Sequence, residues 1–350
     1  MKARSMVYHP FSHRPGHEVL VPFTSWKARV FPAALHLSCL LSCQEIKLSL
    51  GIKGPVVPFT VEQDLQEGCL ILYGQSLEGY VRIKLAKKGQ ALVLSLEKTP
   101  LKGVAIEDRV YHSGESLCLV DGLIEGPAFS KERVFFGEHK LQDVDLIRRR
   151  SNLKEVLPLW HALGAMTPPG PLEGQGPTFD LLASCEEKVA KREVSTLYQD
   201  LLYVYWTGLS EGLVPRSRDE AFQGILPERD GGCPLSLLPR GARLIRSLLL
   251  QEQGGQLHLL PALPSDFVCG KAFFLQTLQG HEVYLEWTKH LMRTVCIRVQ
   301  KEDTILCRFP REVKRFRLKK HGKDRGYKVE TDQEIPVQKG DVLWMDRFEK

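Results

Sequence analysis

Long apolar runs are missing from this 350-residue chain. None approaches the roughly 20 residues that cross a bilayer, so we expect no membrane insertion. The first 22 residues lack the continuous apolar stretch of a signal peptide, because Pro10, Pro15 and three histidines interrupt them. No CxxC pair occurs among the nine scattered cysteines. This usage indicates free thiols in a reducing compartment, and we expect a cytoplasmic protein.

A strong charge of one sign is absent as well. Lys and Arg number 48 against 42 Asp and Glu, and a formal net charge of +6 is too weak by itself to indicate nucleic-acid binding. Hydrophobic residues at 43% and charged residues at 26% exclude a disordered or collagen-like chain. The length predicts about two or three domains. The 29 glycines and 21 prolines, which follow no period, favour a β-rich fold with many turns.

Two residue spacings are reminiscent of metal sites, but neither supports one. His9, His13 and His17 would share a helix face, yet the prolines between them prevent that helix. Cys39 and Cys43 are four residues apart, and no second pair follows to complete a ligand set. We expect no metal site and no cofactor.

The first 145 residues predict a β-sandwich. Apolar residues alternate through Val81, Ile83 and Leu85 and again through residues 92–96, on either side of a turn at residues 87–90. This pattern is typical of a β-hairpin with one face exposed to solvent. Further strand-like runs, bounded by Gly, Pro or polar clusters, occur at residues 28–37, 45–52, 69–73, 116–123 and 133–136.

The rest of the chain predicts a helical region at residues 146–255 and an antiparallel β-domain at residues 256–350. Apolar residues have helical spacing over residues 143–163, 192–209 and 241–252, separated by long Pro- and Gly-rich loops. Alternation of period two returns at Val283, at Val295 and at Ile305. It returns once more at Val342 and Trp344, which are expected to share the buried face of a strand. We therefore expect a multidomain α+β protein.

A segment near residue 260 resembles a known family. Leu259 to Pro264 read Leu-Leu-Pro-Ala-Leu-Pro, and a strand ending in Glu286 and Trp287 follows. This resembles the C-terminal region of glycoside hydrolase family 95, the α-L-fucosidase-like enzymes; the further matching positions are Gly270, Leu275, Gly280, Glu282 and Val283. Two prolines make the first part a rigid connector, so the likeness indicates a fold and not a reaction.

The chain departs from this family at several positions. Gln276 and Leu278 stand where the family has arginines, and Phe267 stands where it has a tryptophan. A catalytic Asp-Gly-Asn motif lies some fifteen residues before the end of the family's last helix, and counting back from Gln251 places Ser236 there. The family's toroid of about a dozen helices also exceeds the room between the two β regions, which holds about four to six.

Loop carboxylates of the helical region are the candidates for catalysis. Inverting hydrolysis needs a carboxylic acid and a carboxylate about 6.5 to 9.5 Å apart. Asp230 would be the base if an insertion of about six residues is allowed, with Glu228 or Glu211 as the acid. Aromatic side chains that could stack on sugars, and so bind substrate, are Trp206, Tyr203 and Trp160, of which the tryptophans also fit a core.

Residues 314–328 carry a basic run with interleaved aromatic residues. Arg315 and Arg317 alternate with Phe316 and Leu318, which suits an edge strand with one charged face and, secondarily, an RNA-binding surface. We expect carbohydrate and not nucleic acid as the ligand. The sequence predicts a glycoside-hydrolase-like protein that binds glycans or has lost catalysis; the alternatives are an active inverting glycosidase and an interaction or RNA-binding module. It predicts no oligomeric state.

Overall fold

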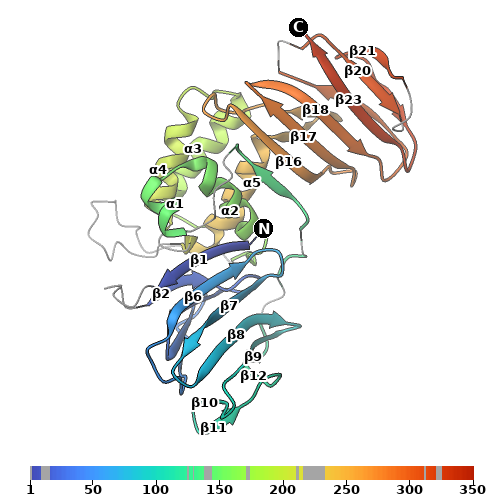
Figure 1. Ribbon diagram of the computed structural model, residues 1–350. Coiled ribbons are helices and arrows are strands. Elements are labelled where there is room, and N and C mark those ends of the chain that lie inside the picture. Colours follow the sequence, from blue (N-terminus) through green and yellow to red (C-terminus); the bar gives the residue numbers. More distant parts are fainter. Residues whose placement is uncertain are drawn as a thin grey trace.

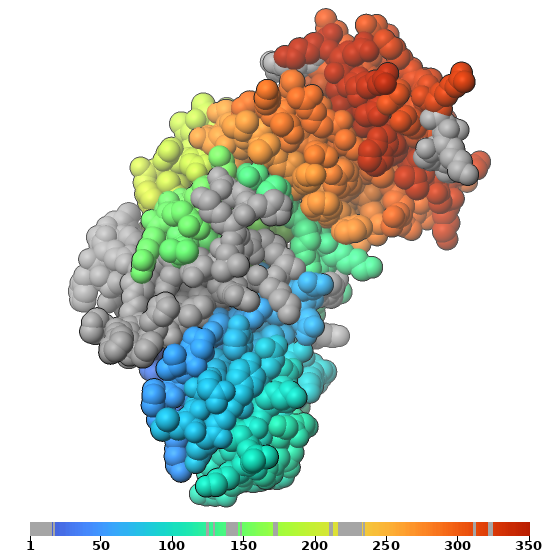
Figure 2. Space-filling model, viewed as in Figure 1, coloured from blue at the N-terminus to red at the C-terminus, as the bar shows by residue number. Residues whose placement is uncertain are grey.

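A computed structural model describes most of the chain. The described residues are 2–8, 16–123, 126–128, 130–137, 144–170, 174–209, 213–215, 233–310, 313–320 and 325–350. Strand-rich regions form the two ends of the molecule, and the helices lie between them (Figure 1). The space-filling view shows the same order, with the blue to teal N-terminal region at one end and the orange to red C-terminal region at the other (Figure 2).

The N-terminal part is a β-sandwich, as predicted. One sheet has the order β1-β6-β7-β8-β9-β12 and the other the order β2-β3-β4-β5. Their strands are β1 (Lys2–Tyr8), β2 (His17–Leu20), β3 (Trp26–Phe31), β4 (Ala34–Cys39), β5 (Glu45–Ser49), β6 (Val57–Asp64), β7 (Cys69–Ser76), β8 (Gly79–Lys88), β9 (Ala91–Lys98) and β12 (Ser116–Val120). A small hairpin, β10 (Val104–Ile106) and β11 (Arg109–Tyr111), extends from one end.

The predicted hairpin is β8 and β9. Val81, Ile83 and Leu85 are at most 3% exposed, as are residues 92, 94 and 96 of β9, while the intervening residues face outward. Pro32 lies in the turn between β3 and β4, so the run predicted at residues 28–37 is two strands. A proline cannot donate to a ladder, and a turn accommodates it.

The helical region contains α1 (Val144–Arg150), α2 (Leu153–Gly164), α3 (Pro177–Lys191), α4 (Leu197–Gly208), a 3-10 turn η2 (Pro234–Ser236) and α5 (Leu237–Ser247). The helix predicted at residues 143–163 is broken at Ser151, whose φ is +48°, and Asn152 then caps α2 by accepting from the Lys154 N–H at 3.0 Å. Among the helices in the described part of the chain, none has the length and apolar character to cross a bilayer.

The later helix boundaries also differ from the prediction. Helix α3 was not predicted, and the helix predicted from Arg192 begins at Leu197, because Arg192 ends α3 in a left-handed conformation with φ +61°. The last helix was predicted to reach Glu252. It ends at Ser247 instead, and residues 250–253 form strand β14.

Two sheets make up the C-terminal part. The larger has the order β13-β16-β17-β18-β23-β20-β21, and its neighbouring strands are antiparallel; the smaller has the order β14-β15-β19-β22, with β15 and β19 parallel. The strands are β13 (Arg133–Phe135), β14 (Leu250–Gln253), β15 (Gln256–Leu259), β16 (Cys269–Gln276), β17 (Glu282–Thr288), β18 (Leu291–Arg298), β19 (Asp303–Arg308), β20 (Arg315–Lys320), β21 (Tyr327–Glu330), β22 (Ile335–Val337) and β23 (Val342–Glu349). The fold is therefore the α+β class that the sequence predicts.

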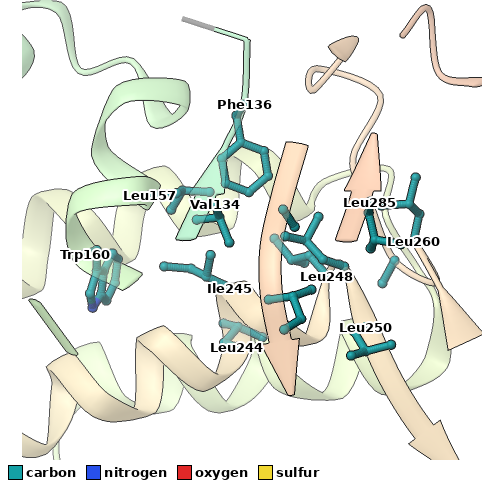
Figure 3. Packing of buried hydrophobic residues seen from close by; sticks show 14 of the residues in the cluster. Val134, Phe136, Leu157, Trp160, Leu244, Ile245, Leu248, Leu250, Leu260 and Leu285 are labelled. Carbon is teal, nitrogen blue, oxygen red and sulfur yellow. The ribbon is translucent and has the colours of Figure 1, made fainter. Parts of the chain in front are cut away.

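Strand β13 joins the C-terminal sheet although it precedes helix α1 in the sequence. Val134 pairs with Ala272 of β16, and Phe136 packs against Phe267 with the ring centroids 4.5 Å apart. Figure 3 shows Val134 and Phe136 gathered with Ile245 and other apolar residues of the helices and sheets. One hydrophobic core thus joins the helices to the C-terminal sheets, while the sandwich has a core of its own. A division of the chain near residues 145 and 255 stays a proposal.

The side chains of β23 face the opposite way to the one that the sequence pattern predicted. Leu343 and Met345 are fully buried, whereas Trp344 is 39% exposed. Side chains alternate between the faces of a sheet, so Trp344 lies on the outer face of the seven-stranded sheet.

Candidate functional site

The predicted catalytic carboxylates, Asp230, Glu228 and Glu211, lie outside the described residues. Three positions from the family-based count are described. Ser236 ends η2, where its hydroxyl donates to the Cys233 carbonyl at 2.7 Å, and Leu237 and Leu238 are at most 2% exposed in α5. These three positions carry no carboxylate, so a general base would have to come from elsewhere in the chain.

Two of the predicted sugar-binding aromatics form an exposed pair on α4. Tyr203 and Trp206 are three residues apart and therefore share a helix face; they are 51% and 41% exposed. Their ring centroids are 5.9 Å apart with an interplanar angle of 72°, an edge-to-face arrangement. The Trp206 Nε1–H donates to the Ser151 hydroxyl at 3.0 Å, which fixes the indole against the break between α1 and α2. The pair offers an oriented aromatic surface.

Packing on the other side of α4 explains why this pair faces outward. Leu197, Leu201 and Val204 are at most 1% exposed and belong to the helical core. An ion pair between Lys188 of α3 and Asp200 of α4, at 2.7 Å, fixes the two helices together, and this contact raises the Lys188 pKa. The sequence signal for the exposed pair is its position away from the apolar stripe of α4.

Trp160, the third predicted aromatic, is packed as a core residue. Its side chain is 1% exposed and lies against Gly241 of α5, which has no Cβ to displace the indole. The indole nitrogen has no hydrogen-bond partner among the described residues. The structure therefore brings Tyr203 and Trp206 together and places Trp160 away from any surface.

A buried ionic cluster connects four elements. The Glu132 carboxylate lies 3.2 Å from Nε of Arg246 and 3.6 Å from Nε2 of His161, and accepts from the Gln276 N–H at 2.8 Å. Burial favours the neutral acid, but the contacts with His161, Arg246 and Gln276 outweigh it and lower the Glu132 pKa. A carboxylate held ionised in this way joins elements and is a poor proton donor. Sequence reasoning missed this cluster because its members are distant in the chain.

A surface hollow of about 700 Å³ lies at β19 and β22. Asp303 lines it and contacts Nε2 of buried His281 at 3.1 Å, while Nδ1 of His281 accepts from the Gln300 N–H at 3.1 Å. Burial opposes ionisation of Asp303, but the Thr304 N–H and His281 outweigh it and lower the Asp303 pKa. The residues that line the hollow include no aromatic side chain, so it offers a sugar no stacking surface.

The basic run forms β20 and β21, and most of its described cations are paired. Arg317 forms two hydrogen bonds of 2.6 Å to Asp346, and Arg315 and Lys328 both contact Glu349. Strand β20 lies between β23 and β21, so it is not the predicted edge strand, although Phe316 and Leu318 are buried and the cations face outward as expected. Pairing with β23 therefore offsets part of the positive charge of this surface, because four cations share the two carboxylates Asp346 and Glu349.

Within the described residues, no group of three or more potential metal ligands comes together. Cys39 ends β4 and Cys43 lies in the following turn, so these two thiols do not share a helix face. His9 and His13 lie outside the described residues.

Comparison with known protein families finds a match in the C-terminal part of the chain. Part of the chain is similar to a glycoside hydrolase domain. Residues 251–342 match the family model of the glycoside hydrolase family 95 C-terminal domain, which confirms the resemblance stated for this region. No curated protein matches the chain. The match begins in β14 and ends at the first residue of β23, so it leaves out β13 and the rest of β23 of the larger sheet.

Proposed function

We propose that the protein binds glycans through Tyr203 and Trp206 on a scaffold derived from a glycoside hydrolase. The observation that carries this function is the exposed, oriented aromatic pair on α4. Aromatic faces pack against the C–H face of a pyranose, and burying them there removes apolar surface from water. The relation of residues 251–342 to a glycoside hydrolase domain supports a sugar as the class of ligand.

The edge-to-face geometry gives the two rings different roles in binding a sugar. Trp206 is held by Ser151 and offers a larger and more rigid surface, so it would hold the sugar ring. Tyr203, whose ring is inclined at 72° to the indole, would contact the side of the sugar and present its hydroxyl to sugar hydroxyls. Preorganised rings lose little conformational entropy on binding, so weak but specific binding is expected.

Ligand-observed NMR with 2'-fucosyllactose, lactose and glucose tests this function. The double variant Tyr203→Ala with Trp206→Ala should raise the Kd for the preferred sugar by about tenfold or more. Leu101→Ala, which alters a fully exposed apolar residue of the sandwich, is the matched control and should leave the Kd unchanged. Equal binding by the double variant and the wild type, or no binding of the three sugars by the wild type, would overturn the proposal.

A second candidate function, an active inverting glycosidase, gains support from the observed end of α5. The family count of fifteen residues starts at the end of the last helix, which is Ser247 and not Gln251, so it falls on Gly232 and not on Ser236. Asp230, in the sequence Asp-Gly-Gly, is then two residues from the expected position, and the required insertion shrinks accordingly.

Aryl fucosides and aryl galactosides distinguish this candidate from a binding protein. Turnover that is abolished by Asp230→Asn would establish the enzyme, with Asp230 as base and Glu228 or Glu211 as acid. Asp266→Asn, which changes an exposed carboxylate in the connector before β16, is the matched control. Sugar binding without turnover would leave the proposed binding function as the activity of the chain.

A further inference from the structure

The outer face of the seven-stranded sheet carries a row of aromatic side chains across its strands. Tyr284 of β17 pairs with Cys296 of β18, which pairs with Trp344 of β23, and Trp344 pairs with Lys319 of β20. Directly paired residues project from the same face of a sheet. The row continues to Phe273 of β16, whose ring centroid is 5.2 Å from that of Tyr284.

Burial on the opposite face shows which way this row points. Val283, Leu285, Ile297 and Leu343 are fully buried, so their neighbours along each strand face away from the core. Trp344 is 39% exposed, far more than a core tryptophan such as Trp287 at 0%. This face is therefore open to solvent, and its strands lie side by side in Figure 1.

A β-bulge widens the aromatic row at β16. The pairing of β16 with β17 shifts between Ala272 and Leu275, and Phe274 has a φ of +58° and is 43% exposed. Such bulges redirect a side chain, and non-glycine residues adopt positive φ only where the surroundings hold them there. A second phenylalanine is thereby exposed beside Phe273 at the beginning of the row.

The charged groups around the row compensate one another. Glu286 lies 3.0 Å from Lys271 and accepts from the Tyr284 hydroxyl at 2.9 Å. The other pairs are Glu282 with Arg298 at 3.2 Å, and Asp346 with Arg317 at 2.6 Å and with Lys319 at 3.7 Å. The surface thus combines apolar rings with many hydrogen-bonding groups, and three carboxylates offset most of the charge of these four cations.

We propose that this face binds an extended, neutral polysaccharide of β-linked pyranoses, which lies across the strands from Phe273 to Trp344. Sugars with equatorial hydroxyls present flat C–H faces to aromatic rings and direct their hydroxyls sideways, where the compensated ion pairs can hydrogen-bond them. Tyr284 and Trp344 are separated by two strand spacings, about 10 Å, which a chain of sugars can span and a single ring cannot.

The ion pairs explain the choice of a neutral ligand. A polyanion would require unpaired cations, whereas the cations beside this row have carboxylate partners. This inference deepens the proposed function by naming a polymer as a ligand, but it uses a surface that shares no residue with the α4 pair. The two can therefore fail independently.

Affinity electrophoresis in gels that contain hydroxyethylcellulose or mixed-linkage β-glucan tests the proposal. Both polymers should retard the wild-type protein, and Trp344→Ala should weaken retardation by about fivefold or more. Tyr284→Phe keeps a ring in the row and should weaken it less. Val268→Ala, which changes an exposed apolar residue just before β16, is the matched control. Urea unfolding of each variant shows whether the sheet is intact, and Tyr284→Phe keeps the test valid should Trp344→Ala fail to fold.

Each of the remaining outcomes supports or rejects one of the two proposed binding sites, the sheet face or the aromatic pair on α4. Retardation that Trp344→Ala leaves intact and the α4 double variant abolishes would overturn the sheet-face site and leave the proposed function standing. Retardation in a protein that binds none of the small sugars would support the sheet-face site and reject the α4 site. Equal retardation by anionic polygalacturonate would overturn the neutral ligand. A dimer in sedimentation that Trp344→Ala dissociates, without polysaccharide retardation of the wild type, would assign the face to a second copy of the chain.

Discussion

Glu132, on the segment that leads into β13, forms an ion pair with Arg246 of α5 at 3.2 Å, across 114 positions of the sequence. The same carboxylate contacts His161 of α2 and the backbone of Gln276 in β16. Because Arg246 also donates to the Gln276 carbonyl, removal of the carboxylate leaves a mostly buried cation with fewer partners. We expect Glu132→Ala to lower the free energy of unfolding by about 2–4 kcal/mol, measured by urea denaturation. Glu193→Ala, an exposed carboxylate after α3, should change it by less than about 0.5 kcal/mol.

The same carboxylate should make stability depend on pH in the acid range. Its pKa is lowered in the folded protein, so the folded state binds fewer protons than the unfolded state near the ordinary value of 4.5. The stabilising contribution is therefore complete above that value and is lost as the pH falls through the lowered pKa. Glu132→Gln should show a shallower loss of unfolding free energy below pH 4.5 than the wild type. Parallel curves for the two proteins would contradict this linkage.

Gly241 should tolerate no side chain, because the Trp160 indole occupies the space. A Cβ at Gly241 would lie 2.3 Å from Cζ2 of Trp160, which is 1% exposed and cannot move toward solvent. Alanine favours a helix over glycine by about 1 kcal/mol, but overpacking of a rigid core costs about 1–3 kcal/mol. Gly241→Ala should therefore destabilise the protein in thermal unfolding. Arg243→Ala, on the exposed side of α5, should have little effect, and a Tm of Gly241→Ala above the wild type would refute this packing argument.

The sequence predicted the parts of the fold that depend on local pattern. Val81, Ile83 and Leu85 alternate with polar residues, and such alternation reports directly which face is buried. The apolar stripe of α4 leaves out Tyr203 and Trp206, which agrees with their exposure, although Trp206 was also expected to fit a core. The sequence also contains a helix signal for α3, which was not among the predicted helices. Pro177 at its first turn is followed by apolar residues at helical spacing: Phe179, Leu182, Cys185 and Val189.

Other features depend on partners that a local pattern does not contain. Strand β13 is three residues long, and its pairing with β16 joins positions more than 130 residues apart. In β23, residues 342–345 are all apolar, so either alternate pair could face the core, and the sheet selects Leu343 and Met345. The Glu132 cluster and the aromatic row of the larger sheet arise only when distant strands and helices meet.

The packing around Gly270, one of the positions that carry the resemblance, leaves no room for a side chain. It pairs with Trp287, and a Cβ there would lie 2.3 Å both from the Phe135 carbonyl oxygen and from Cζ2 of Trp287. Trp287 is fixed in place, since it is fully buried and its Nε1–H donates to the Phe267 carbonyl at 2.9 Å. Gly270→Ala must therefore displace β13 or the indole.

We expect Gly270→Ala to lower the free energy of unfolding by about 2–3 kcal/mol. Hydrogen exchange should be faster at β13 than in the wild type, because the strand that contacts Gly270 is the element best able to move. The control is Val268→Ala, two residues earlier and 41% exposed, which should leave exchange at β13 unchanged. Normal protection of β13 in a destabilised Gly270→Ala variant would show that the indole moves instead.

The thiols should react with iodoacetamide in an order set by burial and local hydrogen bonds. Burial raises the pKa of Cys69 to about 11 and the pKa of Cys307 to about 12, so both should be labelled only when the protein unfolds.

At Cys39, burial also favours the neutral thiol, but hydrogen bonds from Ser25 and Ser42 outweigh it and lower the pKa. Its labelling rate should therefore reach a plateau at lower pH than that of a thiol with the ordinary pKa of 9.0. Peptide mass spectrometry after timed labelling between pH 6 and 9 measures each site, and Ser25→Ala should move the Cys39 plateau to higher pH. Labelling of Cys307 in the folded protein as fast as that of Cys118 would contradict the burial of this thiol.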